Sequence, residues 1–403
     1  MNPLFQALLL QAGYNAALVA IGAALLGFAA GTAGTFLFLR KRALVSDAVA
    51  HATLPGVGLA FILMVMLGGD GRNLAGLLLG SAISAWIGLL SVEWIARRTR
   101  LSEDAAIGAV LSVFFGLGVV LLTVIQSLGS GRQAGLESFL LGSTAGMLFE
   151  DAVTIAIGGA AVVALIWILR RPMTMVAFDP GFAAASGMNV RRVDLAMMGL
   201  VMAVTVIGLK LVGLILIVAL LIIPPVTARF WTERADQVLW VAGLLGAGSG
   251  YVGAAISASA PALPTGPIIV LVSAGLFALS LLFAPARGVA AAVLRRFRFQ
   301  ARVHRRQGLL ALSRSEPIHD PLTLRILGRE GLIRPDGVAT EAGLAQAAKI
   351  ARDERRWEIA RAVHHDTGLT GRYDGLTPIE DVFTPDEIID FDRHIGPPRA
   401  AEV

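Results

Sequence analysis

The stretch that decides how the chain is organised is Arg40-Lys41-Arg42-Ala43-Leu44-Val45-Ser46-Asp47-Ala48-Val49-Ala50-His51-Ala52-Thr53-Leu54-Pro55-Gly56-Val57-Gly58-Leu59. Its basic triplet ends one apolar segment, and the next apolar segment opens with an acid and an imidazole four residues apart. Four residues make about one helical turn, so Asp47 and His51 share a helix face. Pro55 lacks the amide that would bond the His51 carbonyl. This face therefore combines oxygen and nitrogen groups of the kinds that bind divalent metals.

Two interpretations of this pair are open. An Asp and a His at this spacing can form an ordinary polar pair on a helix. An ionisable residue inside a membrane segment is costly, however, and is by default a sign of function. Of the six histidines, His51 alone precedes residue 300. Metal ligation and a plain polar pair are therefore the two hypotheses for Asp47 and His51.

The composition is that of a polytopic membrane protein. Of the 403 residues, 56% are hydrophobic and only 16% are charged, against about 25% charged residues in soluble proteins. The chain has no cysteine, which excludes a disulfide framework, an iron–sulfur cluster and a thiolate metal site. The net charge of +5 comes mostly from Arg and Lys at the edges of apolar segments, so it indicates topology rather than nucleic-acid binding.

Apolar segments alternate with basic clusters along the first 290 residues. The segment 136–149 is too short to cross a membrane comfortably and is expected to be interfacial or re-entrant. The segment 195–227 is long enough for two short spans and is expected to reverse near Val212. Each basic cluster falls on one side, which the positive-inside rule assigns to the cytoplasm. We therefore expect residues 1–290 to form an all-α membrane domain of about eight or nine helices, with the N-terminus outside.

The stretch around Asp47 also resembles a known family. The run 42–58 resembles the signature of the ABC-3 family, which are membrane permeases of bacterial ABC importers for manganese, zinc and iron. The resemblance continues through Leu101–Gly108 and Val212–Arg229 and covers roughly residues 3–290. It implies that Asp47 and His51 form the intramembrane metal site. It also implies a divalent metal ion as substrate and no permanently bound cofactor.

The resemblance implies a permease in the bacterial plasma (inner) membrane rather than an enzyme. The chain has no Gly-x-x-x-x-Gly-Lys-Ser/Thr phosphate loop, so it cannot supply an ATPase of that type. The expected partners are ABC ATPase subunits, a second permease chain that is identical or related, an extracytoplasmic metal-binding protein and the lipid bilayer.

A polar interruption at 177–192 separates two of the expected spans. Asp179 suits a helix N-cap, Pro180 the first helical position and Gly187 the exit, which predicts a short cytoplasmic helix. This helix is either a plain connector or the coupling helix that contacts an ATPase subunit, and the resemblance supports the second reading. The expected coupling residues are Asp179, Pro180, Gly181, Phe182, Ala183 and Gly187.

From Arg287 onward the composition changes abruptly. The segment 291–308 is a basic juxtamembrane linker, and its arginines are expected to meet anionic lipid heads. In the soluble segment 309–403, Leu322–Ile333 predicts a recognition-type helix and Val338–Gly343 a short wing strand followed by a capped helix. This pattern resembles the winged-helix iron-dependent repressor family. We therefore expect a cytoplasmic winged-helix-like α+β domain over 309–403.

The metal-binding positions of that second family hold acids in this chain. They are Glu354, Glu358 and Asp381, where the family pattern has histidine, glutamate and histidine. An all-carboxylate set would suit a harder ion such as manganese in a regulatory site. The alternative is a degenerate site in a structural domain. Because the helix 322–331 carries few cations, no nucleic-acid binding is expected.

Two other function classes are open. A permease for an organic metal chelate or cofactor, of the siderophore or cobalamin type, would have a wide apolar cavity and no ion-ligating pair. An intramembrane metallo-hydrolase would need a third protein ligand and a general acid or base. The spacing of Asp47 and His51 argues against the first, and no other acid in the first 290 residues has a matching motif for the second. Manganese, zinc and iron remain candidate ions.

Overall fold

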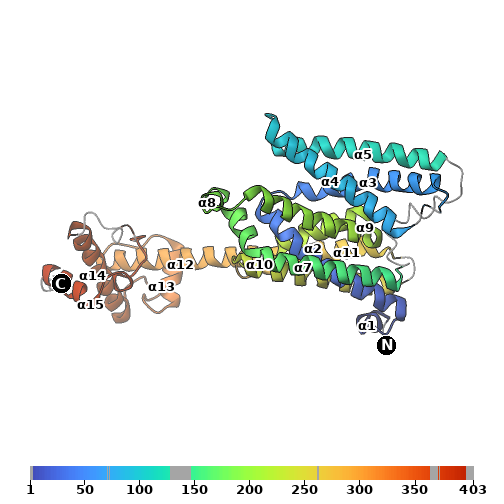
Figure 1. Cartoon of the computed structure of the whole chain (residues 1–403). Coiled ribbons are helices and arrows are strands. Elements are labelled where there is room, and N and C mark those ends of the chain that lie inside the picture. The colour runs from blue at the N-terminus through green and yellow to red at the C-terminus, as the bar shows by residue number, and fades with distance from the viewer. Residues whose placement is uncertain are drawn as a thin grey trace. The chain divides into compact units, whose positions relative to one another are not determined.

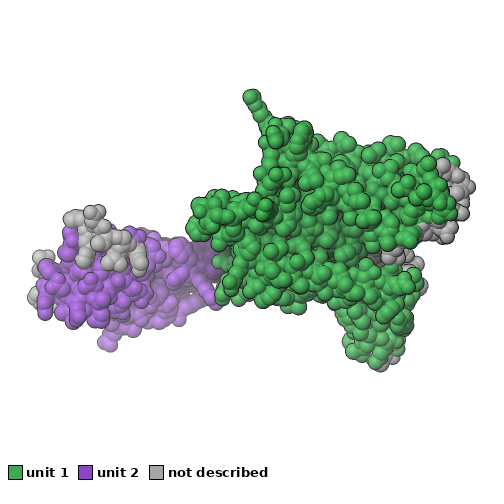
Figure 2. Space-filling model, viewed as in Figure 1, with its two compact units in different colours: residues 1–291 green, residues 292–403 purple. Residues whose placement is uncertain are grey.

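The computed structural model describes residues 3–69, 71, 73–127, 147–260, 263–363, 371 and 373–395. They belong to two compact units, residues 1–291 and residues 292–403, coloured green and purple in Figure 2. The boundary falls inside helix α12 (Val289–Ser313), so the segment expected as a linker, 291–308, is helical. The interfacial or re-entrant segment expected at 136–149 lies almost wholly outside the described residues.

Unit 1 is built from apolar helices. Among the described residues, eight helices are long and apolar enough to cross a membrane, and a shorter apolar helix covers Leu216–Ala228. The prediction of eight or nine membrane helices is thereby confirmed. These elements are α2 (Tyr14–Leu39), α3 (Leu44–Met66), α4 (Leu74–Arg98), α5 (Glu103–Ser127), α7 (Phe149–Phe178), α9 (Val190–Ala228), α10 (Ala235–Ala258) and α11 (Thr265–Phe283). Two six-residue helices, α1 (Pro3–Leu8) and α8 (Pro180–Ala185), complete the described part.

Helix α9 contains the reversal that the sequence predicts. Gly213 has φ 75° and ψ 173°, a non-helical conformation that favours glycine. A Cβ atom added at Gly208 would lie 2.6 Å from Cδ1 of Ile217. In a straight helix, nine residues would separate these positions by about 13 Å along the axis. The chain therefore folds back at Gly213.

The membrane helices pack in two groups (Figure 1). Helix α3 packs on α4 and α5, and we call these the three-helix group. Helix α2 packs on α10, α9 and α7, and α11 packs on α10 and α9, which makes a five-helix group. Helix α9 also packs on α3 and α4 and so connects the two groups. One cluster of buried apolar residues extends through both, from Ala30 of α2 to Val49 of α3 and Leu89 of α4.

Glycines bring the backbones of α2 and α10 into direct contact. A Cβ atom at Gly27 would lie 2.2 Å from the Gly246 carbonyl oxygen, and one at Gly246 would lie 2.1 Å from the Gly27 carbonyl oxygen. Gly31 and Gly250, each one turn further along, are equally close to the opposite backbone, at 2.3 Å. Small residues four apart on one face allow this approach in a membrane.

Unit 2 is a set of helices around two small apolar clusters. Its elements are the rest of α12, α13 (Pro321–Arg329), α14 (Glu341–Val363), the 3₁₀ turn η3 (Ile379–Asp381) and α15 (Pro385–Ile395). One cluster contains Leu309, Leu327 and Leu332, and the other surrounds the fully buried Trp357.

The winged-helix α+β fold expected for 309–403 is not supported. Between α13 and α14 the structure has one isolated antiparallel bridge, Ile333 to Ala339, and the described residues contain no strand. Gly337 (φ 83°) turns the chain two residues after Pro335, which has no amide to donate. The hairpin is therefore too short for a two-stranded wing.

Candidate metal centre

Asp47 and His51 lie in the first two turns of α3. Their side chains approach with Oδ1 of Asp47 and Nε2 of His51 3.4 Å apart. The His51 side chain is 21% exposed and that of Asp47 is 39% exposed. The prediction that the two share a helix face is confirmed. The pair is half-buried in the three-helix group and open enough to be reached by an ion.

The His51 ring has one nitrogen without a partner. Its Nδ1 atom is buried and has no hydrogen-bond partner among the described residues. The ring packs edge-on against Phe115 of α5, with the centroids 5.0 Å apart. Pro55 lies inside α3, so the His51 carbonyl lacks its usual amide donor. The nitrogen that faces Asp47 is Nε2, whereas the buried, unpartnered Nδ1 is an energetic cost at this position.

A cluster of ion pairs around the buried Asp194 lies at the ends of several membrane helices. Arg40, which follows α2, binds Asp194 of α9 at 2.9 Å, and Asp194 is only 7% exposed. Arg42 binds Glu103 of α5 at 2.7 Å and reaches Asp194 at 3.7 Å. In the same region Glu93 of α4 binds both Arg97 and Arg191. Our sequence interpretation missed these pairs, although isolated acids at 93 and 194 within apolar helices were a usable signal.

The short helix predicted at 180–187 is present as α8. The Asp179 carboxylate accepts a hydrogen bond from the Phe182 amide at 2.8 Å, and Pro180 occupies the first helical position. Gly187 (φ 82°) follows the helix end. Within α8, Ala183 is fully buried, whereas Phe182 is 59% exposed. Helix α8 thus presents an aromatic side chain on the surface of unit 1.

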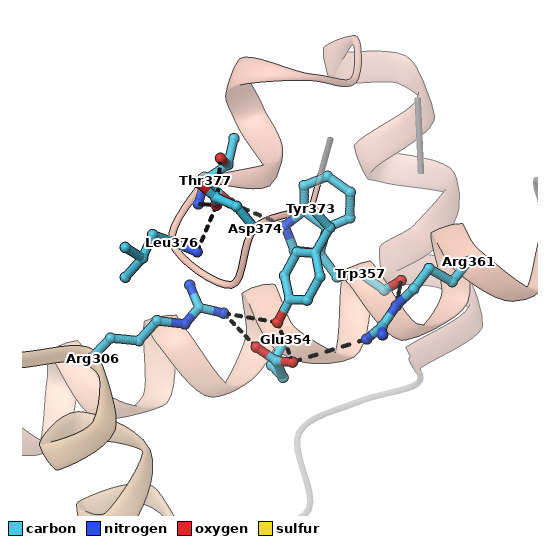
Figure 3. A network of polar contacts seen from close by, with 8 residues as sticks. All are labelled: Arg306, Glu354, Trp357, Arg361, Tyr373, Asp374, Leu376 and Thr377. Carbon is cyan, nitrogen blue, oxygen red and sulfur yellow. Dashed lines mark hydrogen bonds and ion pairs between the residues drawn. The ribbon is translucent and has the colours of Figure 1, made fainter. Parts of the chain in front are cut away.

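In unit 2, Glu354 is already engaged by other side chains (Figure 3). It accepts a hydrogen bond from the Tyr373 hydroxyl at 2.5 Å and forms an ion pair with Arg306, and Arg361 lies 4.0 Å away. Burial raises the pKa of Glu354, but the hydrogen bonds from Tyr373 and Arg306, together with the charges of Arg306 and Arg361, hold this pKa below its ordinary value. The Glu354 carboxylate therefore links α14 to α12, through Arg306, and to Tyr373.

The three acids expected to form a regulatory metal site do not come together. Glu358 on α14 and Asp381 in η3 are both exposed. Within the described ranges, no group of three His, Asp or Glu side chains is arranged to hold a metal. This finding also applies to Asp47 and His51, which supply two ligands from one chain.

Residues 14–284 match the model of the ABC 3 transport family. The chain belongs to this family. It is 41% identical over 310 residues to the manganese transport system membrane protein MntC of Bacillus subtilis, covering 77% of this chain and 70% of that protein. It is 36% identical over 280 residues to the zinc transport system membrane protein TroC of Treponema pallidum, covering 70% and 92%. Its fold is similar to that of PsaBC from Streptococcus pneumoniae in complex with Fab, with a TM-score of 0.58 and 30% identity over 67% of this chain and 91% of that one.

As a member of the ABC 3 transport family, the chain is a multi-pass membrane permease of an ABC transport system and not an enzyme. The family match ends at residue 284. Unit 2 therefore lies beyond the part that defines the family.

Proposed function

We propose that this permease carries a divalent transition metal ion, manganese, zinc or iron, through a site built on Asp47 and His51. The observation that carries the proposal is the approach of the Asp47 carboxylate and the His51 imidazole on one face of α3. Carboxylate oxygen and imidazole nitrogen suit all three ions. The names of the manganese and zinc relatives support the same substrate class.

The pair alone is an incomplete coordination shell. A second permease chain, identical or related, would bring its own ligands to the same cavity and so replace the water lost by the ion. The binding must remain weak enough for the ion to leave, which a shared site with few protein ligands favours. Access would then alternate between the two sides of the membrane as the paired chains rearrange.

The positions proposed for the remaining subunits follow from the exposed surfaces of unit 1 and from its expected topology. ATPase subunits would bind α8, where Phe182 is exposed, on the cytoplasmic side with unit 2. An extracytoplasmic metal-binding protein would deliver the ion to the opposite face, on the side of the N-terminus. No cofactor is needed for this function, because the metal ion is the cargo.

Unit 2 is best explained as a packing or regulatory module on the ATPase side. Its carboxylates at 354, 358 and 381 are dispersed, which argues against metal sensing through these three groups. A transporter truncated after α12 should keep basal uptake. If accumulated ion inhibits the full chain but not the truncated one, unit 2 is regulatory; unchanged inhibition leaves the packing role.

The experiment that tests the proposed function measures ion uptake by cells that carry only this transporter. Asp47→Ala and His51→Ala should each abolish uptake of the transported ion without reducing expression or subunit assembly. Ser46→Ala is the matched control, because the Ser46 hydroxyl bonds its own helix at the Ala43 carbonyl. Competition by manganese, zinc and iron in turn identifies the ion. Normal uptake by both site variants, or uptake only of an organic chelate, would refute the proposal.

A further inference from the structure

The first half of α12 exposes apolar side chains that no part of the described chain covers. Residues 292–299 are all exposed. Val289, Val293 and Phe297 are 47%, 46% and 64% exposed and follow one another at intervals of four, so they lie on one side of the helix. Leu294, 49% exposed, extends this apolar side. A soluble helix would not normally present such a row to water.

Arg298 and Arg302 lie on a different side of the same helix segment, whereas Arg296 lies within about 20° of Val289, at the edge of the apolar side. At about 100° per residue, Arg298 and Arg302 are displaced from Phe297 by about 100° and 140° around the helix axis. Arg296, Arg298 and Arg302 have no ion-pair partner within the part of the chain that the structure describes. The segment 289–302 thus has an apolar side that includes the Phe297 ring and a mainly basic side around Arg298 and Arg302, on which Phe299 is also 51% exposed.

The second half of α12 behaves differently. Arg305 binds Glu330 at 2.6 Å, Arg306 binds Glu354, and Leu309 is fully buried in unit 2. The helix therefore begins to pack into unit 2 only near residue 304. The exposed basic and apolar side chains are confined to the half that adjoins the membrane unit in the chain.

We propose that residues 289–302 form an interfacial helix that lies in the headgroup layer of anionic lipids. Five residues separate the end of α11 at Phe283 from Val289, so α12 begins within about 20 Å of a membrane span. An apolar side that enters the acyl boundary and arginines that reach lipid phosphates are the features of such helices. A protein surface that bound only the arginines would leave Phe297 and Val293 in water.

The test uses the full chain in bilayer nanodiscs. The chain has no cysteine, so a single nitroxide can be attached at Ala290→Cys, on the apolar side, or at Ala291→Cys, about 100° further round. In bilayers containing phosphatidylglycerol, the label at 290 should be shielded several-fold from a water-soluble nickel relaxant while the label at 291 stays accessible. In phosphatidylcholine alone, this difference should shrink.

A charge-matched pair of variants separates lipid binding from general charge effects. Arg296→Gln, Arg298→Gln and Arg302→Gln together should abolish the dependence on phosphatidylglycerol. Arg314→Gln, Arg325→Gln and Arg329→Gln remove the same charge from exposed sites elsewhere in unit 2 and should leave that dependence intact. Equal accessibility at 290 and 291 in anionic bilayers would overturn the proposal. So would shielding that appears only when ATPase subunits are added.

Discussion

Gly27 of α2 and Gly246 of α10 meet so closely that neither position has room for a Cβ atom. Each would place that atom within 2.2 Å of the other residue's carbonyl oxygen. The contact is between two backbones, and no side chain lies between them that could adjust by changing its rotamer. The tolerance of this interface to substitution is accordingly low.

Gly246→Ala should destabilise the membrane unit, because α2 and α10 must separate to admit one methyl group. The expected cost is about 1–3 kcal/mol, measured as a lower unfolding temperature of the purified permease in detergent. Gly248→Ala is the matched control on the same helix, where an added Cβ meets no atom within 4 Å. It should leave stability unchanged or raise it slightly. Equal effects of the two variants would contradict this account of the interface.

Asp194→Asn should destabilise unit 1 strongly, because it leaves the Arg40 guanidinium buried without its carboxylate. Loss of one partner of a buried pair costs about 3–5 kcal/mol. Glu233→Gln breaks the exposed pair with Arg287 and should have little effect, because solvent screens exposed pairs. Thermal unfolding of both variants gives the comparison, and Arg40→Gln combined with Asp194→Asn should recover part of the loss.

Phe182→Ala in α8 should reduce the coupling of ATP hydrolysis to ion uptake while preserving the fold. The side chain is mostly exposed, so its removal takes away partner contact rather than core packing. Phe178→Ala, at the exposed end of α7, is the control. ATPase activity and uptake are measured together in proteoliposomes. Retention of full coupling by Phe182→Ala would count against α8 as the site of ATPase contact.

Cysteine labelling can establish the orientation, since the native chain has no cysteine. A cysteine at an exposed position within 181–187 or after residue 287 should react only after the membrane is permeabilised. Cysteines at 68, 69 and 263 should react from outside intact cells with a membrane-impermeant reagent. Outside labelling at 181–187 would reverse the assignment.

The C-terminal unit should lose stability in acid. Two hydrogen bonds from Arg356, at 2.7 and 2.6 Å, hold the pKa of Asp392 below its ordinary value. Because the folded-state pKa is the lower one, the stabilisation is fully present above the ordinary Asp range and is lost as pH falls through the folded-state pKa. The pair is partly exposed, so it contributes about 1 kcal/mol at most.

Hydrogen exchange of peptides from α14 and α15, corrected for intrinsic rates, measures this acid dependence. Asp392→Asn should remove part of it and weaken the contact between the two helices. Asp390→Asn, on the exposed side of α15, should behave like the native chain. Identical acid profiles for the native chain and Asp392→Asn would exclude the proposed role of the pair.

Local chemistry made several elements predictable from sequence. Asp179, Pro180 and Gly187 each have one role at a helix end, and together they predicted α8. The segment 195–227 was too long for one span, and Gly213 supplies the turn that this length required. The spacing of Asp47 and His51 fixed their shared face, since helical periodicity alone determines it.

Other features depend on contacts that sequence order does not reveal. Arg40 and Asp194 are 154 residues apart, and only the packing of α2 on α9 brings them together. The prediction of a wing strand near 338 was wrong. A family pattern does not show how long the hairpin is, and here the turn at Pro335 to Gly337 leaves room for one bridge only. Glu354 occupies the position of a metal ligand in that pattern, yet Arg306 and Tyr373 engage it.

Unit 1 consists of the three-helix group and the five-helix group, which meet mainly along α9. The five-helix group is rigid where the backbones of α2 and α10 are in contact. An ion held by Asp47 and His51 would move together with the three-helix group. Helix α8 packs on α7 and, to a smaller extent, on α9, so a displacement of α8 by a partner would reach α9 both directly and through α7. The conformational change that moves the ion would then be a rocking of α3, α4 and α5 against the five-helix group.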